Sequence, residues 1–136
     1  PYMIDYLTAV LPATHPLAKA DNLPFEQLRG ETFLLFPEHS FINDLCIREC
    51  RNAGFEPHIA YTGNRGATLI DLVRNGAGIT LMMHHSARQE NDSSLAFIPV
   101  TPGIYSYISL NYAKEKPLSP QAESFVRYVK AHKRDF

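Results

Sequence analysis

Two short polar loops carry the side chains of this sequence that best suit a ligand. The first loop lies between an apolar run at residues 32–36 and a helical pattern that starts at its last residue, and it reads Pro37-Glu38-His39-Ser40-Phe41. In open α/β sheets, ligands collect where the carboxyl end of a strand leads into a helix. Free N–H groups there, together with the Ser40 hydroxyl, suit a carboxylate, a sulfate or a similar anion. The alternative is that Ser40 only caps its own helix.

The second loop follows the next predicted strand and reads Thr62-Gly63-Asn64-Arg65-Gly66. It occupies the equivalent position before a second helical pattern, so Thr62, Asn64 and Arg65 are candidates for the same site. An arginine there can pair with an anionic ligand. The alternative is an ordinary solvent-exposed arginine at the start of a helix.

The cysteines and histidines do not have the spacing of a catalytic or metal site. Cys46 and Cys50 lie four residues apart on a predicted helix, and two thiols alone favour small buried side chains over a metal or redox site. His84 and His85 are adjacent on a predicted strand and would point to opposite faces. With His39 they form no known zinc pattern. There is also no nucleophile elbow, P-loop or pair of catalytic carboxylates, so we expect no enzymatic activity, no metal and no cofactor.

The stretch Ala67–Met83 organises the elements around these loops. Its apolar residues recur at helical spacing until Asn75-Gly76, whose residue types close a helix in the left-handed conformation. Gly78 then frees the backbone before a short apolar strand at residues 79–83. These glycines follow a helix instead of a strand, which is the reverse of a dinucleotide-binding fingerprint and argues against nucleotide binding here.

The remaining elements predict an α/β protein. Strands are expected at residues 2–11, 32–36, 57–61, 95–100 and 105–112, and helical segments at 24–28, 41–53 and from 119 onward. Pro99 favours an edge strand or a strand that crosses between lobes. The alternation of strand and helix from residue 32 to 83 implies right-handed crossovers and a mostly parallel sheet flanked by helices.

Two of the predicted helices have apolar stripes. The stripe of the first contains Phe41, Ile42, Leu45, Cys46 and Cys50. The stripe of the last contains Ala122, Phe125, Val126 and Val129, after an N-terminal Ser119-Pro120.

Composition bounds the class of protein. The chain has 136 residues, 45% of them hydrophobic, and a net charge of -1, which suits one globular domain or two small lobes that share a hinge. No apolar run approaches the length that spans a bilayer, and no signal peptide opens the chain, so we expect a cytoplasmic protein without membrane contact. With a pI near 6.7 and no basic stripe, these residues do not form a nucleic-acid surface.

Several short motifs, in their order and spacing, resemble the effector-binding domain of LysR-type transcriptional regulators. They are His15-Pro16-Leu17-Ala18, the pattern L-x-x-L-x-G within residues 23–30, Ala53-Gly54-Phe55-x-Pro57, Leu72-Val73-x-x-Gly76-x-Gly78-Ile79, and Leu118-Ser119. The resemblance implies a two-lobed fold like a type II periplasmic binding protein. Residues 24–94 would form lobe II, and residues 1–23 and 95–136 would form the later parts of an incomplete lobe I.

The resemblance also implies a function. A small effector, expected to be anionic, would bind between the lobes, with Thr8 and His84 as further candidates on or near the crossing strands. The family's winged helix-turn-helix and the first part of lobe I are not in this sequence, so DNA would be bound only through that absent domain, in a homo-oligomer. The helix at residues 41–53 would be a candidate subunit surface.

One cysteine position departs from the family's peroxide-sensing member. The family's peroxide sensor has two reactive cysteines, and Phe41 stands where the first would be, although Cys50 matches the second. That argues against peroxide sensing. A solute-binding protein of the same fold is the alternative function, and an enzyme of this fold is a third.

Overall fold

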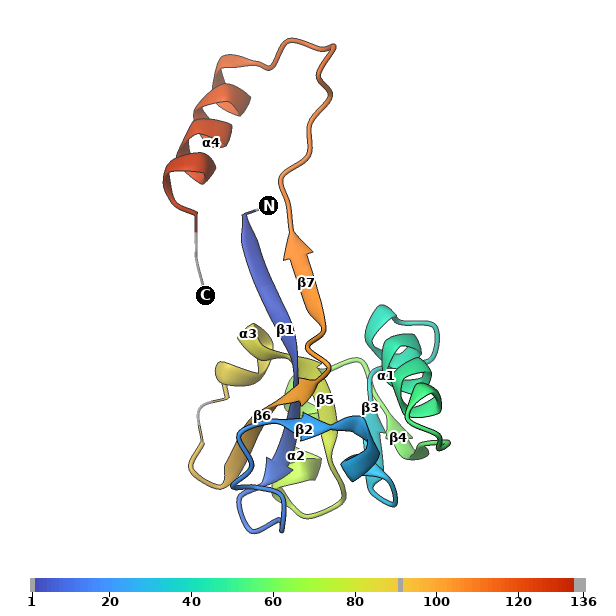
Figure 1. Ribbon diagram of the computed structural model, residues 1–136. Coiled ribbons are helices and arrows are strands. Elements are labelled where there is room, and N and C mark those ends of the chain that lie inside the picture. Colours follow the sequence, from blue (N-terminus) through green and yellow to red (C-terminus); the bar gives the residue numbers. More distant parts are fainter. Residues whose placement is uncertain (1, 91, 134–136) are drawn as a thin grey trace. The chain divides into compact units, whose positions relative to one another are not determined.

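The computed structural model describes residues 2–90 and 92–133. Its elements follow in the order β1 (Met3–Pro12), β2 (Leu23–Pro24), the 3₁₀ helix η1 (Phe25–Leu28), β3 (Thr32–Leu35), α1 (Phe41–Asn52), β4 (His58–Thr62), α2 (Gly66–Arg74), β5 (Thr80–Met83), α3 (His84–Arg88), β6 (Leu95–Thr101), β7 (Tyr105–Ile108) and α4 (Pro120–Ala131). Figure 1 shows this α/β arrangement, with helices beside the strands.

The larger sheet is built around β1. Its strand order is β2-β6-β1-β5, and β7 also pairs with β1. β1 runs antiparallel to β5, with Leu7 opposite Met83, and antiparallel to β6, with Thr8 opposite Pro99. β2 runs parallel to β6. Because β6 lies between β2 and β1, Pro99 does not mark an edge strand. Of the two expectations for this strand, the edge was wrong, and the crossing between lobes stays a prediction.

The parallel pairing predicted for the region from residue 32 onward is present in the smaller sheet. β3 and β4 are parallel neighbours, with a register shift between Phe33 and Leu34. A parallel bridge joins Phe33 to Ile79, and the Ile79 amide donates to the Thr32 carbonyl oxygen over 2.8 Å. The pairing is therefore mixed: it is parallel between β4, β3 and Ile79, the residue before β5, and antiparallel around β1.

Two hydrophobic clusters lie on opposite faces of these strands. Alternate residues of β1 and β5 belong to different clusters, as the period of a strand requires: Ala9 and Leu81 to one, Val10 and Met82 to the other. The first cluster also contains the buried side chains of α1 and η1, and the second those of α2 and α3. The sequence pattern of α1 and α2 thus buries one stripe of each helix against a different face of the strands.

The helix α2 ends at Asn75-Gly76, as predicted. Asn75 is the C-cap and Gly76 has a φ of +80°, the left-handed conformation that glycine adopts without strain. At Gly78 a Cβ atom would lie 2.4 Å from the Thr32 carbonyl oxygen. Only a residue without a side chain allows β3 and the start of β5 to approach this closely.

Three local expectations were wrong. Phe41 does not belong to the buried stripe of α1, because its side chain is 65% exposed. His84 and His85 lie on the short helix α3 and not on a strand. The strand at residue 105 ends at Ile108 and is largely exposed. The apolar stripe of α4, in turn, is not buried by the described residues.

The chain divides into two compact units. Unit 1 comprises residues 1–5 and 105–136, and unit 2 comprises residues 6–104. These boundaries differ from the lobe boundaries at residues 23 and 94, so the division into lobes stays a prediction. No helix among the described residues is both long and apolar enough to cross a membrane.

Candidate functional site

The two polar loops meet at the carboxyl ends of β3 and β4. The Gly63 amide, just after β4, donates to the Leu35 carbonyl oxygen at the end of β3 over 3.0 Å. Parallel pairing is the cause, because it places both strand ends on the same side of the sheet. A hollow of about 430 Å³ at this place includes residues from both loops, and its lining is Glu38, His39, Asn43, Asp44, Ile47, Ile59, Ala60, Tyr61 and Thr62.

The first loop turns sharply into α1. Its backbone passes through a left-handed residue, His39, with a φ of 65°, and the Ser40 amide donates to the Pro37 carbonyl oxygen. Ser40 is the N-cap of α1, and its hydroxyl oxygen accepts from the Asn43 amide over 3.3 Å. The capping role of Ser40 is therefore confirmed, while its ligand role stays a prediction. The exposed Phe41 begins the helix and is absent from the hollow's lining.

Asn43 is a residue that sequence reasoning missed. It is 1% exposed, it lines the hollow, and its side-chain amide donates to the Phe36 carbonyl oxygen over 2.8 Å. This bond fastens the residue just before the first loop to the first turn of α1, so it closes the loop at its base. The available signal in the sequence was a polar residue next to the apolar stripe of a helix, which could have indicated a buried side chain with a hydrogen-bond partner.

The second loop leaves the start of α2 without a side-chain cap. Arg65 is the N-cap residue, with extended backbone and no side-chain cap hydrogen bond, and its carbonyl oxygen accepts from the Leu69 amide. Arg65, Asn64 and Thr62 are all exposed. The first amide groups of an α-helix have no partner within the helix, so the start of α2 carries a partial positive charge beside the Arg65 guanidinium.

The charges in this region are not uniform. Glu38 and Asp44 line the hollow next to His39 and Thr62, and two carboxylates oppose the entry of an anion there. Arg65 and Asn64 do not line it. The part of the region that attracts an anion is therefore the start of α2 and not the hollow itself.

Thr8 and His84 lie elsewhere in unit 2. Thr8 is fully buried in β1, and its hydroxyl group has no hydrogen-bond partner among the described residues. Thr80, across from Val10, is in the same situation. His84 begins α3, and its ring stacks on Tyr6 with a centroid distance of 4.4 Å. Neither Thr8 nor His84 lines the hollow.

The two cysteines are buried on α1. Burial raises the pKa of the Cys46 thiol, and the neighbouring Cys50 and Glu49 raise it further. Burial also raises the pKa of Cys50 to about 12, with Glu49 and Glu56 adding to the effect. Both thiols are therefore protonated near neutral pH, which suits the predicted role as small core side chains. No group of three or more potential metal ligands occurs among residues 2–90 and 92–133.

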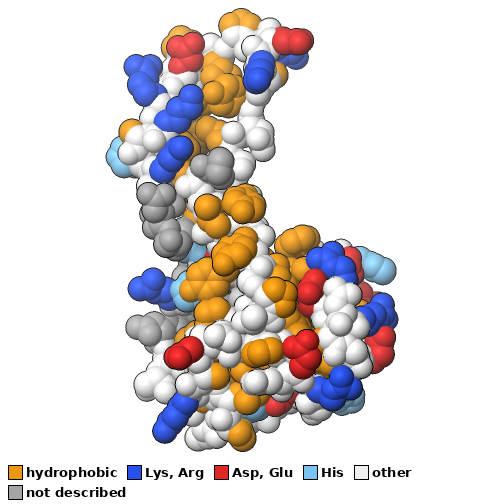
Figure 2. All heavy atoms as spheres, viewed as in Figure 1, with side chains coloured by type: hydrophobic (Ala, Val, Ile, Leu, Met, Phe, Trp, Pro, Cys, Tyr) orange, Lys and Arg blue, Asp and Glu red, His pale blue; other side chains and the backbone are white. Residues whose placement is uncertain are grey.

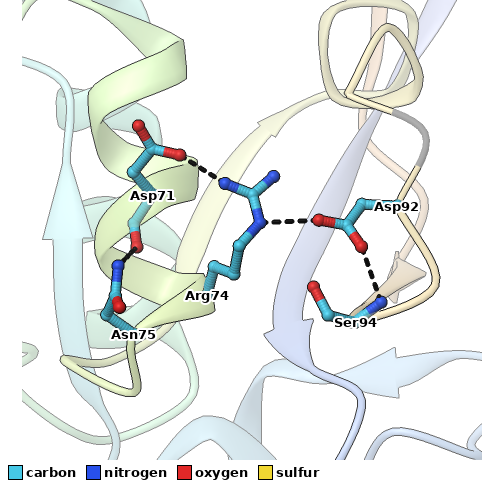
Figure 3. Close-up of polar contacts among 5 residues, drawn as sticks. All are labelled: Asp71, Arg74, Asn75, Asp92 and Ser94. Carbon is cyan, nitrogen blue, oxygen red and sulfur yellow. Dashed lines mark hydrogen bonds and ion pairs between the residues drawn. The ribbon is translucent and has the colours of Figure 1, made fainter.

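An ion-pair network ties the end of α2 to the loop before β6 (Figure 3). Arg74 donates to Asp92 over 2.6 Å and also pairs with Asp71 one turn earlier on α2. Asp92 in turn accepts from the Ser94 amide over 2.8 Å. These hydrogen bonds, first those from Ser94 and then that from Arg74, lower the pKa of Asp92 to about 2. The network anchors the helix whose other end forms the second loop.

Comparison with curated proteins identifies transcriptional regulators as relatives. The transcriptional dual regulator GltC of Bacillus subtilis (strain 168) is 30% identical over 92% of this chain and 42% of its own length. The HTH-type transcriptional regulator CatR of Pseudomonas putida is 33% identical over 69% of this chain and 32% of its own length. This chain spans less than half the length of these relatives.

Solved structures confirm the fold class. The regulatory domain of Synechocystis PCC6803 CcmR, in complex with 2-PG, matches 99% of this chain and 66% of its own chain, with a TM-score of 0.79 and 18% identity. The effector binding domain of QuiR, in complex with shikimate, matches 98% of this chain and 66% of its own, with a TM-score of 0.71 and 20% identity. The predicted two-lobed type II periplasmic-binding-like fold is the fold of these domains.

The family follows from a direct match to a family model. That model describes the LysR substrate binding domain, and it matches residues 2–134, which is nearly the whole chain. The match agrees with the named relatives and with the shared fold. The chain therefore belongs to the LysR substrate binding domain family.

Proposed function

We propose that this chain is the ligand-sensing regulatory domain of a LysR-type transcriptional regulator. Effector binding would shift the balance between two arrangements of the lobes, residues 24–94 as lobe II and the remainder as part of lobe I, and thereby change a DNA-bound oligomer. The DNA-binding segment would lie outside this chain. The family membership and the names of the relatives support this role.

We further propose that the effector is a small anion held where the two loops meet. The observation that carries this proposal is the bond between Gly63 and Leu35, which joins the loops after β3 and β4 at the ends that precede α1 and α2. The uncapped start of α2, Arg65 and Asn64 would bind the negative group. His39, Ser40 and Thr62 would contact the rest of the ligand. QuiR and CcmR were solved with shikimate and 2-PG, which supports a small-molecule effector.

The other properties of the protein follow from this role. A regulator that meets both an effector and DNA would act in the cytoplasm, as a homo-oligomer and without catalytic chemistry. Among the alternatives, a solute-binding protein or an enzyme of this fold gains no support from the relatives, which are named as transcriptional regulators.

A binding experiment on the intact protein tests the proposed site. A thermal-shift screen of small organic and inorganic anions would first supply a ligand, whose affinity is then measured by titration calorimetry. Replacing Arg65 with alanine removes a charge-assisted hydrogen bond worth about 1.5–3 kcal/mol, so we expect affinity to fall about 10-fold or more.

The matched control is Arg88→Ala, which removes another exposed arginine of unit 2, on α3 and away from the two loops. The Arg88→Ala variant should bind the anion with the affinity of the wild type. Equal affinities of the Arg65→Ala and Arg88→Ala variants would remove Arg65 from the site. Unchanged thermal stability of Arg65→Ala separates a binding effect from a folding effect.

A further inference from the structure

The hollow at the ends of β3 and β4 carries negative charge that the anion site does not use. Glu38 and Asp44 line it, and neither takes part in a salt bridge within residues 2–90 and 92–133. Figure 2 shows acidic and basic side chains intermingled over α1. The arginines of this helix, Arg48 and Arg51, each pair with a different glutamate and do not line the hollow. The two carboxylates therefore face the hollow without a lysine or arginine to balance them.

Asn43 adds a hydrogen-bond acceptor at the base of the hollow. Its side chain is 1% exposed, and its Nδ2 group donates to the Phe36 carbonyl oxygen, but no described residue donates to its oxygen Oδ1. In the described part of the chain, only Thr8 and Thr80 have fully enclosed side-chain oxygen atoms without a partner. The Asn43 oxygen is therefore not enclosed, and it is reached from the hollow that Asn43 lines. A ligand with a hydrogen-bond donor would satisfy it.

Tyr61 contributes an aromatic ring to the same hollow. Its side chain lines the hollow and is 42% exposed. A Cβ atom at Gly63 would lie 2.8 Å from the ring atom Cε1 of Tyr61 and 2.9 Å from its hydroxyl oxygen. The glycine therefore leaves the space in which the ring lies against the second loop. The face of a tyrosine ring attracts an organic cation.

The groups of the hollow share one chemistry. Carboxylates, an amide oxygen and an aromatic ring all attract a cation, and an ammonium group offers several donors to such acceptors. The other polar members, His39 and Thr62, can accept as well as donate. Ile47, Ile59 and Ala60 provide apolar surface for carbon atoms. Since no group of three or more potential metal ligands occurs among the described residues, an organic ammonium group fits the hollow better than a metal ion.

Resting on the anion site proposed above, we propose that the effector is a zwitterion with a carboxylate and an ammonium group. The carboxylate binds at the start of α2 beside Arg65, and the ammonium group binds in the hollow beside Glu38 and Asp44. Thr62 connects the two places, because it lines the hollow and precedes Arg65 in the same loop. The volume of about 430 Å³ lies within the range of small-molecule sites. The two carboxylates thus select against acids that lack an ammonium group.

Titration calorimetry of the intact protein with matched probes tests this inference. The probes are the common L-α-amino acids and a series of unbranched ω-amino acids of increasing length. Each is paired with the carboxylic acid of the same carbon skeleton that lacks the amino group. For the skeleton that fits best, we expect the amino acid to bind at least about 10-fold more tightly than its matched acid, because its ammonium group adds charge-assisted hydrogen bonds.

The variant Asp44→Asn separates the two groups of the ligand. It should weaken binding of the amino acid at least about 10-fold, whereas the matched acid should bind as tightly as before or more tightly, because a repelling charge is removed. Retained binding of the acid also shows that the variant is folded. The control is Glu26→Gln, at an exposed glutamate of η1 that does not line the hollow, and it should change neither affinity.

Three results would overturn the inference. One is an Asp44→Asn variant that weakens the amino acid and the matched acid equally. Another is a set of acids that bind and lose affinity in Arg65→Ala but gain nothing from an ammonium group, which would remove the zwitterion and leave the anion site in place. If no probe of either kind bound to the wild type, the zwitterion and the anion site would both be rejected.

Discussion

Asp92 makes a contribution to stability that depends on its charge. Hydrogen bonds from Ser94 and Arg74 lower its pKa from 3.8 to about 2 in the folded chain. A carboxyl group whose pKa is lowered by folding stabilises the native state fully above its unfolded value. That contribution is lost as the pH falls from about 3.8 to about 2. Asp92→Asn should therefore unfold more readily than the wild type at neutral pH, and the difference should vanish across this window.

Urea unfolding of wild type and Asp92→Asn at a series of pH values measures this difference. A double-mutant cycle with Arg74→Ala then isolates the pair, because each single variant also disturbs other contacts. If the free energies of unfolding of the two proteins differed by the same amount from neutral pH down to pH 2, the assignment of the lowered pKa to Asp92 would be contradicted.

The structural role of some single residues could be predicted from the adjacent sequence, and that of others could not. The capping role of Ser40 was predictable because it depends on the residues that follow it directly. The burial of Asn43 was not, because its partner is the carbonyl group of Phe36 in a loop whose course depends on the register of two strands. The positive φ of His39 was not predicted, since only a few per cent of residues other than glycine adopt this conformation.

Gly78 sets the distance between two elements. A Cβ atom at this position would lie 2.4 Å from the Thr32 carbonyl oxygen, which is part of the pairing between β3 and the start of β5. Backbone must move to relieve that clash, so we expect Gly78→Ala to lower the free energy of unfolding by about 2–3 kcal/mol, the upper range for overpacking. Denaturant titration measures the change.

The comparison variant is Gly76→Ala. Gly76 has a positive φ but open space around it, so only the cost of the left-handed conformation remains, about 1 kcal/mol. If Gly78→Ala proved milder than Gly76→Ala, the close approach of the two strands would not be the reason for the glycine.

Two helices of equal length permit a test of burial. α1 and α4 each have 12 residues and a serine N-cap, but α1 buries Asn43, Leu45, Cys46 and Cys50 whereas α4 buries nothing. Local opening costs less where few side chains pack. In the 136-residue chain we therefore expect the amides of α4 to exchange with solvent at least about 10-fold faster than those of α1. Hydrogen exchange followed by mass spectrometry resolves the two helices, and similar rates would contradict the difference in packing.

The positions of most helices and strands in the sequence were predictable, but which of them pair or pack with one another was not. Local signals located α1, α2 and every strand except the two-residue β2, because caps, glycines and periodicity act within one turn or one strand. The short helix α3 was missed, since it has five residues and no N-cap side chain. The antiparallel course of β1 was also missed, because its partners β5 and β6 come from residues about 70 to 90 positions later. The stripe of α4 was read correctly as apolar, but its burial depends on what covers it.

The chain as a whole combines low net charge with exposed apolar surface. Its net charge is -1 and its pI about 6.7, and most of the exposed large hydrophobic side chains lie on unit 1. Near its pI a protein loses the repulsion that keeps molecules apart. We therefore expect the isolated 136-residue chain to self-associate most strongly near pH 6.7 and less at pH 9. Light scattering across this pH range checks the trend, and scattering that does not change with pH would contradict it.

The fold class was accessible from the sequence only through the resemblance of several motifs taken together. Composition and periodicity alone led to an α/β protein with loops at strand ends, and the family match and the shared fold confirm the more specific assignment. The position of a ligand stays a prediction, because it depends on the meeting of loops and on side chains such as Glu38 and Asp44, whose charge opposes part of the expected chemistry.

The division of β1 between the units limits how the protein can be shortened. Its first residues, up to Asp5, belong to unit 1, and the rest of the strand, to Pro12, lies at the centre of the larger sheet. A cut just before Tyr6 would leave that sheet its central strand but would deprive β7 of its hydrogen-bonding partner. Residues 2–5 are thus needed to pair with β7, and a fusion partner is better attached through a spacer than in exchange for them.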